Sequence, residues 1–359
     1  MERWTNNSAA SRRRPLLVAI PLLLLVLSAC SQELPQNSLD PAGPISRDID
    51  GLFRLVFWIA VVIFVLVQGG LLYSVFRFRM RKGEELRPVA QVHGNTRLEV
   101  VWTILPAILL AGIAVPTLRT LFDLSAEPEG ERIDVNVVGH QWWWEFEYPE
   151  LGVVTANELH IPAEETVYLT MTSDDVIHSF WVPKLNGKRD AVPGRETNLT
   201  LIADADTVGD DPILGQCAEF CGLAHADMRI RVFVHTPEDF AEWVAQQAQP
   251  AVIPTEGPAA AGWETFQVVC SACHAVGGSD FQQRLAPDLT HFASRTTFGS
   301  ATFESTPENL RAWLHNPSDL KPMDPDRNDI AAGRILGMPN FGLSESEITE
   351  LLALLESFR

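Results

Sequence analysis

The chain has 359 residues and carries 46 acidic against 27 basic side chains, a net charge of −19 at pH 7. This length predicts two or three domains, and an acidic surface repels nucleic acid and attracts basic proteins. Residues 1–122 carry 13 basic and 8 acidic side chains, residues 123–250 carry 7 and 24, and residues 251–359 carry 7 and 14. Since the long apolar runs lie in the basic first third, we expect a membrane anchor followed by water-exposed acidic domains.

The N-terminus has the layout of an export signal. Three arginines at 12–14 precede a 12-residue apolar run at 16–27, and this run is shorter than the ~20 residues that a membrane span requires. The sequence LSAC at 27–30 resembles the lipobox of bacterial lipoproteins. The resemblance implies a signal peptide over 1–29, an extracytoplasmic segment over 30–51, and a lipid on the sulfur of Cys30. An ordinary signal with a cysteine near its cleavage region is the alternative.

Two apolar stretches, 52–76 and 98–122, are each 25 residues long and predict a transmembrane hairpin over 52–122. The loop between them carries six basic side chains and two acidic ones, so the positive-inside rule places it in the cytoplasm. Both flanks then lie outside, in agreement with the export signal. The alternative is a buried hairpin of a soluble protein.

Two further domains follow the hairpin. Apolar residues alternate with polar ones between 132 and 235, a pattern that predicts short strands in a sandwich or barrel, and we assign this domain to 123–249. Residues 250–262 are rich in Pro, Ala and Gly and predict a linker. Residues 263–359 show helical spacing, as at Ile348, Leu351, Leu352 and Leu355, and predict an all-helical domain.

Cys270, Cys273 and His274 form the sequence CSACH, in which two thiols can bind a c-type haem and the histidine its iron. A zinc or redox pair is the alternative, but zinc would need two more ligands, and this domain has no other cysteine. Residues 286–289, APDL, resemble the stretch of small cytochromes c in which a proline carbonyl, here that of Pro287, orients the axial histidine.

Met323 and Met338 are the two candidates for the sixth ligand of the haem iron. Met338 begins the sequence MPNFGLSESE, which resembles the cytochrome c arrangement that leads into the closing helix. Pro339 favours an extended backbone at Met338, and Ser344 with Glu347 predicts a helix cap. Met323, between charged residues and two prolines, predicts an exposed loop. Met338 is therefore the expected ligand, and a methionine ligand raises the haem potential.

The second constellation lies in residues 215–228, with His178 on an earlier turn. A mononuclear blue-copper site uses two histidines, one cysteine and a weak methionine on a β-sandwich. This set is present in full with one cysteine in excess, and two thiolates in one loop can bridge two copper ions. A short disulfide is the alternative outside the cytoplasm.

The spacing of this loop resembles the binuclear CuA site of cytochrome oxidase subunit II, and the resemblance covers nearly the whole chain. It implies a cupredoxin-like Greek-key barrel. The implied ligands are the bridging thiolates Cys217 and Cys221, one imidazole for each copper from His178 and His225, the weak ligand Met228, and the backbone carbonyl of Glu219. The Glu219 side chain would also bind a magnesium or manganese ion shared with subunit I.

Two further segments match this family. In the aromatic run 139–148, the resemblance places Trp142 where electrons enter the copper centre. With a fused haem domain, these electrons would come from the haem of the same chain and not directly from an external donor. Trp143 stands where the family commonly has tyrosine, and for Trp143 and Trp144 we expect core packing. Glu99 lies in a segment that resembles the entrance of a proton-uptake path, although ionisable groups at helix ends are often only solvated.

The resemblance implies the electron-input subunit of a proton-translocating cytochrome c oxidase in the bacterial inner membrane, with both soluble domains outside. Electrons would pass from cytochrome c or another respiratory donor to haem c, then to CuA, then to the oxygen-reducing site of subunit I. Subunit III would be a further partner. Two alternatives are the input subunit of a nitric oxide reductase and a copper-delivery or redox-sensing module.

Overall fold

The computed structural model describes residues 34–80, 94–323 and 336–359, and residues Ser38–Arg359 belong to one compact unit. The expected signal peptide, the lipidation site Cys30 and most of the basic loop lie outside the described residues. Nothing in the structure therefore bears on them.

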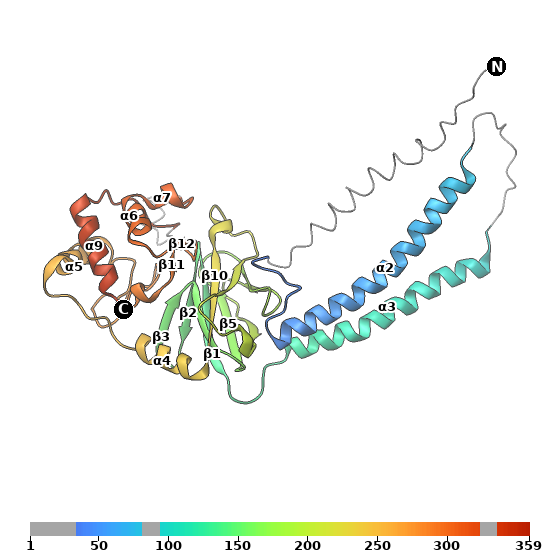
Figure 1. Cartoon of the computed structure of the whole chain (residues 1–359), viewed down its shortest axis with the longest axis horizontal. Helices are drawn as coiled ribbons and strands as arrows, with labels where there is room; N and C mark the ends of the chain where they lie inside the picture. Colours follow the sequence, from blue (N-terminus) through green and yellow to red (C-terminus); the bar gives the residue numbers. More distant parts are fainter. Residues whose placement is uncertain (1–33, 81–93, 324–335) are drawn as a thin grey trace, which may run out of the picture. The chain divides into compact units, whose positions relative to one another are not determined.

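Two long helices confirm the expected transmembrane pair: α2 (Pro44–Phe78) and α3 (Thr96–Ser125), shown in Figure 1. They contain 35 and 30 residues, enough at 1.5 Å per residue to cross a bilayer. The Asn95 side chain caps α3 by accepting hydrogen bonds from the N–H groups of Arg97 and Leu98. The Glu99 carboxylate accepts the N–H of Asn95 at 3.2 Å, so this residue has a capping role at the start of the helix.

The following domain contains two five-stranded sheets, with strand orders β3-β2-β1-β5-β8 and β4-β10-β9-β6-β7. The pairs β1 with β5 and β4 with β10 are parallel, and the other neighbours are antiparallel. The strands are β1 (Ile133–His140), β2 (Trp143–Tyr148), β3 (Val153–Ala156), β4 (Glu158–Pro162), β5 (Val167–Ser173), β6 (His178–Trp181), β7 (Arg189–Ala191), β8 (Thr197–Leu201), β9 (Ile213–Cys217) and β10 (Arg229–His235).

Alternation along the strands builds the core of this cupredoxin-like domain. Val135 and Val137 of β1 are fully buried, whereas their neighbours are half-buried. The aromatic rings of Trp144, Phe146 and Phe180 are also fully buried and meet edge to face. Burial of such a side chain contributes about 1.5–3 kcal/mol, so this core fixes the two sheets and the loops between them.

The C-terminal domain has a core of its own and is mostly helical. Its elements are α5 (Gly257–Val269), β11 (Thr297–Phe298), β12 (Phe303–Glu304), α6 (Pro307–His315), α7 (Pro317–Leu320) and α9 (Glu345–Ser357), and α4 (Pro237–Gln247) precedes them. Helices α5 and α9 cross closely at Gly262, where a Cβ atom would lie 2.2 Å from the carbonyl oxygen of Glu350. Ser344 and Glu347 form the predicted capping box at the start of α9.

Two details differ from the expectation. Helix α5 begins at Gly257, within the predicted linker 250–262, because Pro258 suits a helix start and three alanines favour the helix. The remaining connection is held at Ala251, whose N–H donates to Gly277. The predicted all-helical domain also contains the hairpin of β11 and β12, which proves to be important for the contact with the β-sandwich.

Candidate metal centre and haem pocket

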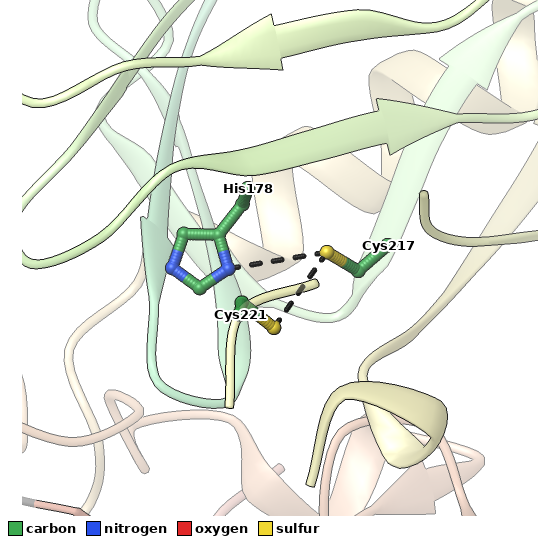
Figure 2. Close-up of side chains that lie close together, drawn as sticks. All are labelled: His178, Cys217 and Cys221. Carbon is green, nitrogen blue, oxygen red and sulfur yellow. Dashed lines mark hydrogen bonds between the residues drawn. The ribbon is translucent and has the colours of Figure 1, made fainter. Parts of the chain in front are cut away.

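Two neighbouring strands and one loop bring together a cluster of sulfur and imidazole groups. His178 begins β6, Cys217 ends β9, and Phe180 pairs with Cys217 in the register of these strands. Figure 2 shows the three side chains His178, Cys217 and Cys221 pointing toward one another. The two sulfurs are 3.8 Å apart, and Nδ1 of His178 lies 4.0 Å from the sulfur of Cys217.

The other expected copper ligands converge on the same point. Nδ1 of His225 lies 3.6 Å from the Cys221 sulfur, and the sulfur of Met228 lies 3.9 Å from it. The carbonyl oxygen of Glu219 lies 3.2 Å from the Cys217 sulfur. The Cys217 N–H donates to the carbonyl of Met228 at 2.8 Å, so a backbone hydrogen bond closes the loop around these donors.

Hydrogen bonds shift the pKa values of the groups in this cluster. The hydrogen bond between the two thiols lowers the pKa of Cys217 and raises that of Cys221. Burial disfavours protonation of His178, but hydrogen bonds with Asp175 and Cys217 outweigh it and raise the His178 pKa. Asp175 holds Nε2 of this ring at 2.8 Å, so Nδ1 faces the sulfurs. Such a partner fixes the tautomer and orientation of a metal-binding histidine.

These donors fit a copper centre better than a disulfide. Cys217 and Cys221 are free thiols, and their 3.8 Å separation is well above the S–S bond length of about 2.05 Å. Thiolate, imidazole and thioether are the ligands that soft copper ions prefer. Metal binding would release the proton that Cys221 retains.

A second, largely apolar pocket lies in the C-terminal domain. Cys270, Cys273 and His274 line it, together with Phe266, Leu289, Phe298, Leu310, Leu351 and Leu355. Nδ1 of His274 donates to the carbonyl of Pro287 at 2.7 Å, the contact that the sequence comparison implied. Nε2 is then left for a metal, and burial lowers the His274 pKa, which keeps the imidazole in its neutral, metal-binding form. The pocket therefore fits a haem attached through both cysteines.

Both candidate methionines line this pocket. Met338 packs against the core of the C-terminal domain, and its sulfur accepts the indole N–H of Trp313 at 3.2 Å. The expectation that Met323 lies in an exposed loop is wrong. It is partly buried and packs against the core of the β-sandwich and against Gly337, because the C-terminal domain lies against that sandwich.

Trp142 connects the two sites. Its indole N–H donates to the carbonyl of Cys221 at 3.0 Å, and the residue also lines the apolar pocket. Gln141, which the sequence did not single out, also donates to the Cys221 carbonyl, at 2.6 Å. Trp143 stacks on His140 with ring centres 4.2 Å apart, and Trp144 is fully buried; both pack as expected.

Polar contacts between the two domains were also missed, since nothing in the local sequence marks them. Glu158 accepts hydrogen bonds from Thr296 and Thr297, and Lys321 donates to the carbonyl of Trp142. Arg284 lies 3.5 Å from Glu145. These contacts come from segments more than 130 residues apart, so only the tertiary structure could reveal them.

The fold and the two sites define a membrane-anchored, cupredoxin-like protein fused to a cytochrome c domain. Residues 31–120 match the transmembrane domain of cytochrome c oxidase subunit II, residues 151–234 match its periplasmic domain, and residues 259–359 match cytochrome c. The CuA-type domain and the cytochrome c domain imply that the protein binds copper and haem.

Two relatives extend over most of the chain. Cytochrome c oxidase subunit 2 of Alkalihalophilus pseudofirmus is 34% identical and covers 100% of this chain and 99% of its own. The protein of the same name from Bacillus sp. PS3 is 37% identical over 84% of this chain and 88% of its own. The crystal structure of the periplasmic domain of subunit II from Bradyrhizobium japonicum matches 33% of this chain and 95% of its own, with 30% identity and a TM-score of 0.31. The chain belongs to the cytochrome c oxidase subunit 2 family.

Proposed function

We propose that this chain is the electron-input subunit of a haem-copper terminal oxidase in a bacterial inner membrane. It would accept electrons from an external donor, such as cytochrome c, at a covalent haem c and pass them through a binuclear CuA centre to the oxygen-reducing site of subunit I. The position of Trp142 carries this proposal, because this one buried residue lines the haem pocket and its indole donates to the carbonyl of Cys221.

Copper would supply one-electron chemistry at a potential tuned by its surroundings. Cys217 and Cys221 would bridge the two ions, and His178 and His225 would each bind one of them through Nδ1. Met228 and the carbonyl of Glu219 would complete the set as weak ligands. Asp175 holds the His178 ring in place. A ligand shell fixed by strands and backbone hydrogen bonds in this way needs little rearrangement between redox states.

The haem would be bound through thioethers to Cys270 and Cys273, with His274 and Met338 as its axial ligands. Pro287 orients the His274 ring, and the Trp313 indole N–H fixes the sulfur of Met338. The bulky apolar side chains around the pocket exclude water, which favours a raised haem potential.

The exposed edge of the copper loop is proposed as the contact with subunit I. Phe220 and Leu223 are 76% and 59% exposed there, and the neighbouring Glu219 side chain is also exposed. Exposed apolar side chains at the rim of a site suit a protein interface. The Glu219 carboxylate could then bind a magnesium or manganese ion shared with subunit I, and subunit III would be a further partner.

The membrane part is proposed to anchor the protein by α2 and α3 and by a lipid on Cys30, with both soluble domains on the extracytoplasmic side. Glu99 at the start of α3 would lie at the cytoplasmic surface and serve proton uptake for a proton-translocating oxidase. The full-length likeness to proteins named cytochrome c oxidase subunit 2 supports oxygen over nitric oxide as the final acceptor. A haem pocket would be superfluous in a copper-delivery protein.

The decisive experiment is Cys217→Ser in the purified oxidase complex, with the exposed Lys188→Met as the control. We expect loss of the near-infrared copper absorption and of oxygen consumption, with the covalent haem retained, because each thiolate would contact both ions. Gas uptake by the wild-type complex should show consumption of oxygen rather than nitric oxide. Two coppers per chain and normal turnover in Cys217→Ser would contradict the bridging role.

A further inference from the structure

Lys321, directly after α7, is a buried lysine at the contact between the two soluble domains. It is 3% exposed, and its ammonium donates to Ser300 Oγ at 2.6 Å, to the Trp142 carbonyl at 3.0 Å and to the Gly299 carbonyl at 3.4 Å. These three acceptors match its three protons. Lysine is almost never fully buried unless it is paired, yet among the described residues no carboxylate forms a salt bridge with it. Its hydrogen-bond partners are instead the Trp142 carbonyl and two groups of the neighbouring turn, the Gly299 carbonyl and the Ser300 hydroxyl.

The turn between β11 and β12 supplies the second donor to the same carbonyl. Gly299, Ser300 and Ala301 all have positive φ, at 61°, 68° and 56°, a conformation that is uncommon for residues other than glycine. This turn brings the Ser300 hydroxyl into a hydrogen bond with the Trp142 carbonyl. The carbonyl of Ser300 in turn accepts the N–H of Arg229 at 3.2 Å, immediately after the copper loop.

Hydrogen bonds therefore hold Trp142 at its side chain and at its backbone. Its indole N–H donates to the Cys221 carbonyl, and its own carbonyl accepts from Lys321 and Ser300, which both belong to the haem-bearing domain. We propose that Lys321, together with Ser300, is a positioning residue that keeps Trp142 in its place between the haem pocket, which it lines, and the copper loop, which its indole contacts. This inference rests on the proposed function, in which Trp142 lies between the two redox centres.

The chemistry of the contact favours an amine at position 321. The carbonyls of Trp142 and Gly299 are acceptors only, so a buried side chain that satisfies both must offer several N–H groups. A methionine of similar length would leave the Gly299 carbonyl without the lysine donor and the Trp142 carbonyl with Ser300 as its remaining side-chain donor, and the loss of buried hydrogen bonds is destabilising. Burial lowers the pKa of Lys321 to about 7, but a neutral amine still has two N–H donors, so the contact does not depend on the charge.

The test compares Lys321→Met and Ser300→Ala with Lys188→Met, an exposed lysine of the β-sandwich, in the complete oxidase complex. Electrons are injected into the haem by a photoexcited ruthenium complex, and the reduction of the copper centre is followed by absorption. Hydrogen exchange at 140–143 and 298–301 is measured by mass spectrometry on the same samples.

We expect haem and copper contents to be unchanged. Protection of both segments should fall about tenfold, as for the loss of one strong hydrogen bond, and internal electron transfer should slow. Lys188→Met should change neither quantity.

Trp142→Phe separates this inference from the proposed function. If Trp142→Phe leaves internal transfer unchanged, the proposed route is wrong. If Trp142→Phe slows the transfer but Lys321→Met and Ser300→Ala do not, the positioning role alone is refuted. Should Lys321→Met lose haem or copper, Ser300→Ala decides: slower transfer with intact cofactors supports the role, and an unchanged rate overturns it.

Discussion

Replacement of Glu158 should release the β11–β12 hairpin from the β-sandwich while both domains stay folded. Glu158 begins β4 and is 1% exposed. Its carboxylate accepts the N–H groups of Thr296 and Thr297 at 3.1 and 2.8 Å, and both threonine hydroxyls at 2.6 Å. One buried carboxylate thus binds four donors of the haem-bearing domain.

The magnitude follows from the nature of these bonds. Hydrogen bonds to a charged group contribute about 1.5–3 kcal/mol each, against about 0.5–1.5 for neutral pairs. Glu158→Ala leaves four donors without their acceptor, and truncation of a buried, hydrogen-bonded charge costs about 2–5 kcal/mol; we expect about 4 kcal/mol. Glu158→Gln keeps one oxygen but turns an N–H group toward the N–H of Thr296, so a smaller loss of about 2 kcal/mol is expected.

Hydrogen exchange of residues 294–304 in the full-length protein measures this loss directly. At 1.4 kcal/mol per tenfold, protection should fall by up to about 1,000-fold in Glu158→Ala and about 30-fold in Glu158→Gln. Strand β5 should keep its protection, and Glu150→Gln, at an exposed turn, serves as the control. Unchanged exchange at 294–304 in Glu158→Ala would refute the reasoning, because the hairpin would then be held by other contacts.

Four further predictions concern single residues. Met338→Ala should abolish the weak sulfur-to-iron absorption band and lower the haem potential, while Met323→Ala should do neither; the reverse result would make Met323 the ligand. Burial raises the pKa of Glu145 from 4.5 to about 7, against the attraction of Arg284, so the folded protein binds this proton more tightly than the unfolded chain does. The free energy of unfolding should therefore fall between pH 4.5 and about 7, by at most about 3 kcal/mol, and urea titrations should show that Glu145→Gln lacks this component. Glu99→Ala should slow steady-state oxygen consumption without loss of copper or haem, and an unchanged rate would leave only the capping role. Mass spectrometry of the mature N-terminus should find a lipid on Cys30, and an unmodified cysteine would rule out the lipobox.

The sequence predicts those features that depend on local pattern. Chain length and apolar composition are enough to identify two spanning helices, and period-two alternation is enough to identify a β-domain. Residue type and spacing could identify a copper-type donor set in Cys217, Cys221, His225 and Met228, with His178 from an earlier turn, whereas the role of each ligand needed the family resemblance. The contact between His274 and Pro287 was predictable through the resemblance of residues 286–289 to a stretch of small cytochromes c.

Contacts between segments that are distant in the chain could not be predicted from the sequence. Met323 looks exposed among its charged neighbours, and only the docking of the two domains buries it. Glu158 and Lys321 read as ordinary surface charges, since charged residues are mostly exposed, yet both are buried. The hairpin of β11 and β12 has two residues in each strand, too few for a pattern of alternation to stand out.

Burial of Glu158 and Lys321 also determines how the protein responds to ionic strength. Salt screens exposed charges beyond a Debye length of about 8 Å at 0.15 M, but it screens buried groups much less. Added salt should therefore leave the contact between the haem domain and the copper domain intact. Under the proposed function, the encounter with a basic external donor would depend instead on the exposed acidic surface of a chain with net charge −19. Salt should thus slow the delivery of electrons to the chain and leave their passage within it unaffected.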